Sequence, residues 1–165
     1  MRQLLIVGLI VSMTGVAGIT GSDQASRGFQ GAWQVTEFVI PGPQPRTIPR
    51  PEPRTNLIVF TGKYYSRVED QSQAARPVLA DVATASADQL RAAWGPFVGE
   101  AGTYEVAGNV ITMHPIASKN PAVMGPDVFI AYTFTIGGDR LTLTQSRNQD
   151  GPFATPFTLR AVRVE

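Results

Sequence analysis

The sequence of 165 residues contains no cysteine and a single histidine, His114. The absence of cysteine excludes disulfide bonds, thiolate chemistry and every metal site built on cysteine, and one histidine excludes a multi-histidine metal site. Charged residues are scarce, at 16%, and 14 Lys and Arg nearly balance 13 Asp and Glu. Because proteins that bind phosphate backbones usually carry a basic excess, we expect no nucleic-acid partner. We also expect no metal and no cofactor.

The N-terminus has the layout of a secretory signal peptide. Arg2 gives a short positive start, residues 4–11 form an apolar run, and small residues lead to a polar stretch that includes Ala25. The apolar run is short for a membrane span. We expect residues 1–25 to be a cleaved signal, with an uncleaved membrane anchor as the alternative. Residues 26–165 are then one exported domain, periplasmic or extracellular, without a stable membrane span after signal removal.

The rest of the chain is typical of short β strands separated by turns. Eight segments rich in β-branched and aromatic residues are predicted strands: 32–40, 56–61, 64–69, 103–107, 110–116, 128–137, 140–146 and 157–164. One segment is predicted to be helical, because Ser86 and Gln89 form a capping-box pattern and Gly95 ends it. The composition therefore indicates an all-β domain with one short helix.

The connections between these strands alternate strictly between short and long. Gly62-Lys63, Gly108-Asn109 and Gly138-Asp139 are typical of tight hairpin turns. The long connections are residues 41–55, 70–102, 117–127 and 147–156. In an up-and-down meander this alternation places all tight turns at one end and all long connections at the other. Closure removes the two exposed edges, which predicts an eight-stranded antiparallel barrel with a closed floor and an open mouth.

The first and last strands carry a recognisable pair of residues. Gly31-Ala32-Trp33 opens the first strand, and Arg163 lies near the end of the last, so both should meet at the floor, guanidinium over indole. Gly-x-Trp with a late Arg resembles the signature of the lipocalins. Further segments resemble the bacterial lipocalin-like domain family: 56–68, 89–116, 117–124, 141–145 and 162–165. The resemblance implies a small lipocalin-like barrel whose floor is formed by Trp33 and Arg163, and it implies little about chemistry.

The tight turns predict which side chains face the barrel interior. Tyr132 pairs with Gln145 across one turn, Phe134 lies on the same face, and Tyr104 pairs with Met113 across another. These five side chains are predicted to line the interior. Tyr132 and Gln145 form a polar pair toward the mouth.

Glu37 is the most unusual residue of the first strand. It alternates with Trp33, so an interior Trp33 predicts an interior Glu37, and a buried carboxylate needs a partner or a raised pKa. The alternatives are that strand twist exposes Glu37 or that an interior arginine satisfies it. The predicted ligand-binding residues are therefore Glu37, Tyr104, Met113, Tyr132, Phe134 and Gln145.

Three further features have structural or functional interpretations. His114 is predicted to lie opposite Thr103 on the outer face, near the mouth. Residues 41–54 are Pro-rich and contain three arginines spaced by four, which suits a lid over the mouth, a surface that docks a partner, or a stiff solvated connection. The predicted helix with Trp94 should plug or flank the barrel.

These patterns predict a protein that binds a small, mostly apolar or amphipathic molecule in the barrel without turnover, and no catalytic residue is assigned. One alternative is a barrel enzyme of the cyclase or isomerase type, with Glu37 or Tyr132 as acid or base. Another is an envelope module that binds other proteins. An eight-stranded barrel is just wide enough for side chains or one small ligand, so both a packed interior and a cavity are compatible with the sequence.

Overall fold

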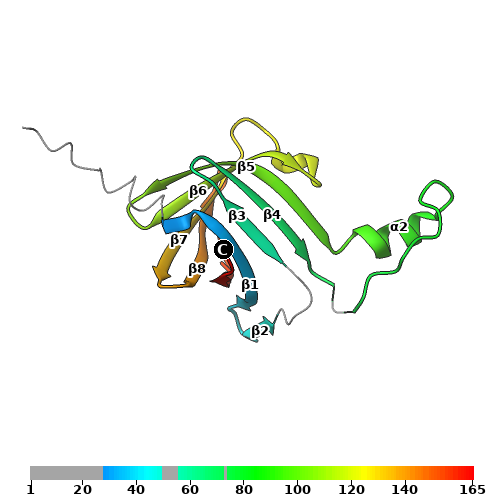
Figure 1. Ribbon diagram of the computed structural model, residues 1–165, viewed down its shortest axis with the longest axis horizontal. Coiled ribbons are helices and arrows are strands. Elements are labelled where there is room, and N and C mark those ends of the chain that lie inside the picture. Colours follow the sequence, from blue (N-terminus) through cyan, green and yellow to red (C-terminus); the bar gives the residue numbers. More distant parts are fainter. Residues whose placement is uncertain (1–27, 50–55, 73) are drawn as a thin grey trace, which may run out of the picture.

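The computed structural model describes residues 28–49, 56–72 and 74–165 (Figure 1). The predicted signal segment and residues 50–54 of the Pro-rich connection lie outside the described residues. The strands are β1 (Gly31–Ile40), β2 (Arg46–Pro49), β3 (Leu57–Phe60), β4 (Tyr64–Asp70), β5 (Phe97–Ala107), β6 (Val110–Ser118), β7 (Ile130–Gly137), β8 (Arg140–Asn148), β9 (Gly151–Pro152) and β10 (Thr158–Arg163). The helices are α2 (Ala87–Trp94) and the single 3₁₀ turn η1 (Pro121–Val123).

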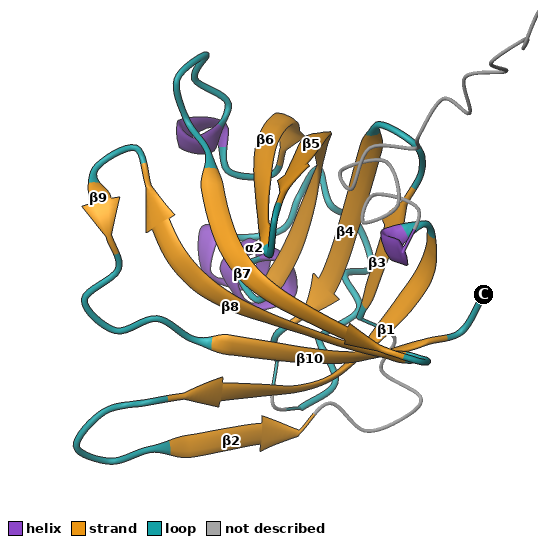
Figure 2. Ribbon diagram, turned by 90° about the vertical axis from the view of Figure 1, so that its left-hand side faces the viewer, coloured by secondary structure: helices purple, strands orange, loops and turns teal. Residues whose placement is uncertain are grey.

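Eight of these strands form a closed antiparallel barrel (Figure 2). From β3 to β8 each strand pairs with the next along the chain, β1 pairs with β3, and β10 pairs with both β8 and β1 and so closes the ring. The short strands β2 and β9 lie outside the ring, on β1 and β8. The predicted all-β, eight-stranded, up-and-down lipocalin-like barrel with one short α-helix is confirmed for the described residues.

The three tight turns lie together at one end of the barrel. The backbone of each turn accepts a hydrogen bond from the neighbouring hairpin: Lys63 from Tyr104, Asn109 from Phe134, and Asp139 from Arg163. The predicted pairing of short turns at one end is therefore correct. Each turn is thus hydrogen-bonded to the adjacent strand of the ring, β5, β7 or β10.

Trp33 and Arg163 meet at this closed end, as the strand order predicts. The guanidinium carbon of Arg163 lies 4.1 Å from the centroid of the fully buried Trp33 ring. Arg163 also donates to the backbone carbonyls of Gly28, at 2.7 Å, and of Gln30. Its charge therefore stays hydrogen-bonded while its flat face covers the indole.

Phe29 completes the floor and was missed by the sequence analysis. Its side chain is fully buried, 4.6 Å from the ring of Phe134 and 5.2 Å from that of Phe60, and its carbonyl accepts a 2.7 Å hydrogen bond from the Trp33 indole. Residues 28–30 thus lie under the barrel, and the Phe29 side chain fills it from below. Its spacing of four residues from Trp33 is the only sequence signal for this role.

Side chains fill the barrel above this floor. The predicted pairs Tyr104–Met113 and Tyr132–Gln145 are confirmed, and the first three of these side chains are buried. The continuous core comprises Phe29, Trp33, Val35, Phe38, Ile58, Phe60, Tyr65, Tyr104, Ile111, Met113, Tyr132, Leu141, Leu143, Leu159 and Ala161. The lower part of the barrel interior is therefore packed with side chains, one of the two alternatives compatible with the sequence. Space for a ligand can lie only nearer the mouth.

Helix α2 lies beyond the ends of β4 and β5 and points away from the barrel (Figure 1). Its predicted start is confirmed, because the Ser86 and Gln89 side chains form the capping box. Only Ala93 of the helix is buried, and Trp94 is 48% exposed. The helix was expected to plug or flank the barrel, and the first of these positions is wrong. A helix with one buried residue has no apolar face large enough to enter the core.

The base of this projecting arm is fastened by two cations. Arg76 pairs with Asp70 at 2.9 Å and donates to the Ala93 carbonyl at 2.9 Å. Lys119 donates to the carbonyls of Gly95, at 3.0 Å, of Phe97, at 2.8 Å, and of Trp94. The last carbonyls of α2 thus have partners although the helix has few packing contacts.

Among the described residues, no helix is long and apolar enough to cross a membrane.

Candidate ligand site at the mouth of the barrel

A hollow of about 200 Å³ lies at the open end of the barrel. Four of its lining side chains are apolar and two are polar: Phe38, Ile40, Ile48, Phe157, Arg67 and Gln71. Phe38 of β1 and Phe157, the residue before β10, meet edge to face, with ring centroids 5.7 Å apart. The hollow therefore has an apolar wall and a polar end, the usual composition of a small-molecule site.

The Pro-rich connection supplies part of this wall. Its residues 46–49 form β2, which pairs with the outer half of β1 so that Ile48 lies opposite Phe38. Ile48 packs against the core, while its neighbour Thr47 is exposed. The prolines around β2 limit it to four residues, because proline has no N–H for the sheet. The described part of the predicted lid is thus a fixed wall of the hollow.

The polar end is built by alternate residues of β4. Tyr65, Arg67 and Glu69 point inward, and the side chain of Glu69 is fully buried. Arg67 Nε donates to Glu69 Oε1, and Gln71 Nε2 donates to Glu69 Oε2 at 3.2 Å. A buried carboxylate is expensive unless it is paired, and here both of its oxygens have partners.

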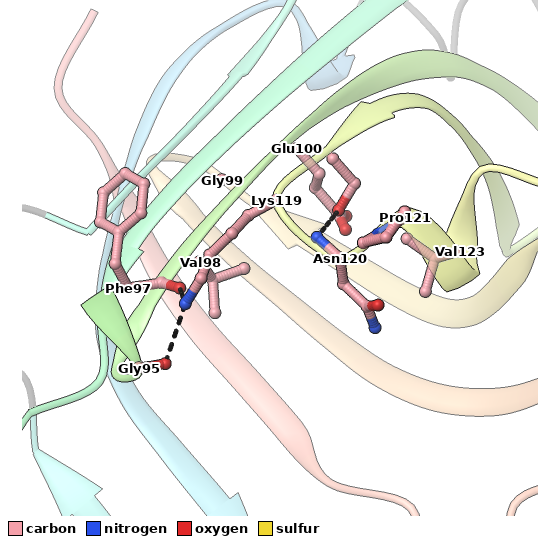
Figure 3. Close-up of a pocket in the computed structure, with 10 residues that line it drawn as sticks. Gly95, Phe97, Val98, Gly99, Glu100, Lys119, Asn120, Pro121 and Val123 are labelled. Carbon is pink, nitrogen blue, oxygen red and sulfur yellow. Dashed lines mark hydrogen bonds between the residues drawn. The ribbon is translucent and has the colours of Figure 1, made fainter. Parts of the chain in front are cut away.

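The network continues to β5 through Glu100. Its Oε1 accepts a 3.3 Å hydrogen bond from the Tyr65 hydroxyl and lies 3.9 Å from Nη1 of Arg67. Glu100 also lines a second hollow of about 480 Å³, where β5 begins and β6 ends (Figure 3). Lys119 lines the same hollow, but its ammonium group is occupied by the backbone carbonyls of the arm. The Arg67–Glu100 pair therefore connects the two hollows.

The charges and phenols of this network influence each other. Burial opposes the charge of Arg67, yet the adjacent Glu69, with help from Glu100, raises the pKa of Arg67 above its ordinary value. Burial raises the pKa of Tyr65, and Glu100 raises it further. Burial likewise raises the pKa of Tyr132, which Arg67 partly counteracts. At neutral pH both phenols are thus protonated: the Tyr65 hydroxyl donates to Glu100, and the Tyr132 hydroxyl accepts from Arg67.

These raised phenol pKa values predict a loss of stability in alkali. Burial also raises the pKa of Tyr104, so Tyr65, Tyr104 and Tyr132 all stay protonated in the folded protein above pH 10. The unfolded chain then binds fewer protons, and the free energy of unfolding falls by up to about 1.4 kcal/mol per pH unit for each phenol. We expect tyrosinate absorbance to rise together with the loss of circular dichroism. Ionisation of these three phenols near pH 10 in a protein that remains folded would contradict this.

Glu37 lies outside the barrel, which corrects the expectation of an interior carboxylate. Relative to β10, β1 contains one extra residue between Val35 and Glu37, a β-bulge that reverses the alternation. Phe38 is therefore the buried residue, and Glu37 pairs on the outer surface with Arg160, at 2.5 Å. Glu37 is therefore outside the barrel, as one of the weighed alternatives expected, but it is half-buried in its ion pair, and the cause is a bulge and not strand twist.

The other predicted ligand residues are distributed between the core and the mouth. Tyr104, Met113 and Phe134 belong to the packed interior, where the Tyr104 hydroxyl donates to the Thr61 carbonyl at 2.6 Å. The Gln145 side chain accepts a hydrogen bond from the backbone N–H of Phe157, at 3.3 Å. Tyr132 is the one of the six next to the charged network. None of the six lines the hollow of about 200 Å³.

Arg67, Glu69 and Glu100 were not singled out from the sequence. The signal was present in residues 64–70, where Tyr65, Arg67 and Glu69 occupy alternate positions. It was ambiguous because the partner strand β3, Leu57–Phe60, is apolar on both faces and does not show which face of the pair is internal. A buried charged stripe is also contrary to the usual hydrophobic-in pattern of such strands.

Within residues 28–49, 56–72 and 74–165, no group of three or more His, Asp or Glu is placed to hold a metal ion. No protein-family model matches the chain, and no curated protein matches it.

Proposed function

We propose that the protein is an exported, lipocalin-like binding protein that holds a small amphipathic molecule at the mouth of its barrel without converting it. The hollow of about 200 Å³ carries this proposal, because it joins four apolar side chains to the Arg67 guanidinium and the Gln71 amide. Such a site favours a molecule with an apolar body and one polar end. The Gly-x-Trp sequence and the Arg163–Trp33 stack support the likeness to lipocalins, and the signal-like N-terminus supports export.

The size of the hollow limits the apolar body. A cavity of about 150 Å³ lined by aliphatic and aromatic side chains holds one benzene molecule. At about 200 Å³, the hollow at the mouth accommodates a single ring with a small substituent, or a short branched chain. The packed lower barrel leaves no space for a long acyl chain to extend inward.

The charges beside the hollow determine the polar end of the ligand. The positive charge of Arg67 is already next to two carboxylates, those of Glu69 and Glu100. An anionic ligand would bring a third negative charge to this single cation and would be repelled by the other two. A cationic ligand would meet Arg67 directly. A neutral acceptor, such as a carbonyl or ether oxygen, gains a hydrogen bond from Arg67 or Gln71 without either penalty.

The enzyme alternative loses one of its two candidate groups. Glu37 lies on the outer surface in its pair with Arg160, so it does not reach a molecule inside the barrel. Tyr132 is buried and protonated at neutral pH, which suits a hydrogen-bond donor and not a base. The geometry therefore supports binding better than turnover.

Replacing Ile48 by Trp should fill the hollow and abolish binding there. We expect acetophenone, which has one ring and a carbonyl, to bind wild-type protein about tenfold more tightly than toluene, because of one hydrogen bond from a charged donor. Benzoate should also bind more weakly than acetophenone, because it adds a negative charge. Ligand-observed NMR would measure the three affinities, and native mass spectrometry of protein from its own host would show whether a ligand of this size copurifies.

The matched control is Thr47→Trp, which adds the same ring to the adjacent, exposed position of β2. It should leave acetophenone binding unchanged. Equal affinities of I48W and T47W, or a wild-type protein that binds none of the three compounds and copurifies with nothing, would disprove the site.

A further inference from the structure

A third hollow, of about 550 Å³, lies on the outside of the barrel. It is formed by the outer faces of β6, β7 and β8 and by Pro152 of β9. His114 is on this outer face, since it pairs with Thr103 while the neighbouring Met113 is buried in the core. The hollow is thus separated from the mouth site by the wall of the barrel, and the proposed function does not use it.

One aromatic ring joins the two nitrogen-bearing side chains of this hollow. The guanidinium carbon of Arg147 lies 5.2 Å from the centroid of the Phe129 ring, and the ring of His114 lies 6.0 Å from the same centroid. Arg147 is therefore held over Phe129 by a cation–π contact, and its N–H groups at the edge of the guanidinium remain available. Phe129, Ala131 and Pro152 give the hollow an apolar surface next to these donors.

The ring nitrogens of His114 and the guanidinium group of Arg147 have no hydrogen-bond partner among the residues that the structure describes. Neither His114 nor Arg147 makes a side-chain hydrogen bond or ion pair there. No Asp or Glu lines the hollow either, whereas Arg67, Arg76, Arg91 and Arg160 each pair with a carboxylate. Arg147 thus differs from these four arginines in offering an uncompensated charge to a molecule in the hollow.

We infer that this outer hollow binds a small organic anion, with its carboxylate or sulfonate on Arg147 and His114 and its apolar body against Phe129 and Pro152. An arginine can donate two parallel hydrogen bonds to such a group, and histidine has one N–H in either neutral tautomer. The adjacent apolar surface distinguishes the site from a plain phosphate or chloride site. The barrel would then carry a neutral-acceptor site at its mouth and an anion site on its wall.

The test uses two fluorescent probes with the same rings. Anilinonaphthalene sulfonate carries the anion, and phenylnaphthylamine lacks it. We expect the sulfonate probe to bind, and Arg147→Gln to weaken it about tenfold, the effect of losing one charge-assisted hydrogen bond. The neutral probe should not respond to R147Q. Arg140→Gln is the matched control, because Arg140 lies on the same strand and does not line the hollow, and it should leave both probes unchanged.

Ile48→Trp separates this site from the site at the mouth. If the inference is correct, I48W binds the sulfonate probe as wild type does, whatever its effect on acetophenone. Loss of the sulfonate probe in I48W would place the anion at the mouth and overturn the inference. Unchanged affinity in R147Q, or an equal loss in R140Q, would overturn it as well. Circular dichroism of each variant confirms that the compared proteins are folded.

Discussion

Replacing Trp33 by Ala is expected to lower the free energy of unfolding by about 4 kcal/mol, the usual cost of removing a large aromatic side chain from a core. Trp33 is fully buried at the closed end, donates to the Phe29 carbonyl, and carries the Arg163 guanidinium on its face. The substitution removes all three contacts and leaves a cavity below the core. Because domains of this size are stable by only about 5 to 15 kcal/mol, the loss is a large part of the total.

Trp94→Ala is the control for this prediction. Trp94 is 48% exposed on the projecting arm and contacts Phe97 edge to face, so we expect its loss to cost about 1 kcal/mol or less. Urea unfolding should be followed by circular dichroism, since each variant lacks one of the two tryptophans and fluorescence would not be comparable. Similar losses in both variants would show that the indole at the floor has no special role.

The second large effect is expected from Arg67→Met. This change leaves the fully buried Glu69 without its ion-pair partner and removes the cation nearest Glu100. Breaking a buried pair by removing one member typically costs about 3 to 5 kcal/mol, because the remaining charge is buried and uncompensated. We expect a loss of this size in urea unfolding at neutral pH, measured with ligand absent.

The double variant Arg67→Met/Glu69→Leu distinguishes charge from packing. Removing both charges replaces the ion pair by apolar side chains of similar volume, which is often neutral or even stabilising. Most of the stability lost in R67M should therefore return. A double variant as unstable as R67M would show that the single substitution acted by disturbing the shape of the core. The double variant should also lose part of the preference for acetophenone over toluene, because the Gln71 amide is then the remaining hydrogen-bond donor among the lining residues of the hollow.

The barrel could be predicted because its determinants are local. Alternating apolar residues define the strands, and the three Gly-containing turns fix their order and registers. Gly108 and Gly138 adopt φ values of +59° and +62°, a conformation that glycine takes without strain. The capping box at Ser86 and Gln89 fixed the helix start in the same way.

The features that the sequence did not reveal depend on contacts between strands. The bulge at Thr36 turns Glu37 outward. The sequence of β1 alone does not show that it has one residue more than its partner β10 at this point. The sequence places residues 70–102 in a long connection, whereas in the structure β5 already begins at Phe97. A Cβ on Gly102 would lie 1.9 Å from the His114 carbonyl oxygen, so glycine is required there by the close approach of β6. This requirement becomes visible only when both strands are in place.

The candidate site was predicted in kind but not in position. An apolar hollow with a polar end was expected inside the barrel, and it lies at the mouth because Phe29 and the other core aromatics fill the interior. Its charged end comes from β4. The sequence does not show which face of β4 is internal, because the partner strand β3 is apolar on both faces. The position of the site thus depends on how completely the core side chains fill the barrel. The alternation of apolar and polar residues along the strands does not show this.

The two strands outside the closed ring have a consequence for self-association. β2 ends at Pro49 and β9 ends at Pro152, so each of these short edges terminates in a residue without a backbone N–H. A second chain that tried to extend the sheet would find a broken ladder of donors at both places. Ring closure and these two prolines therefore both disfavour the addition of strands from other chains. Because strands rich in β-branched residues tend to pair in this way, the prolines protect this sequence against fibril formation.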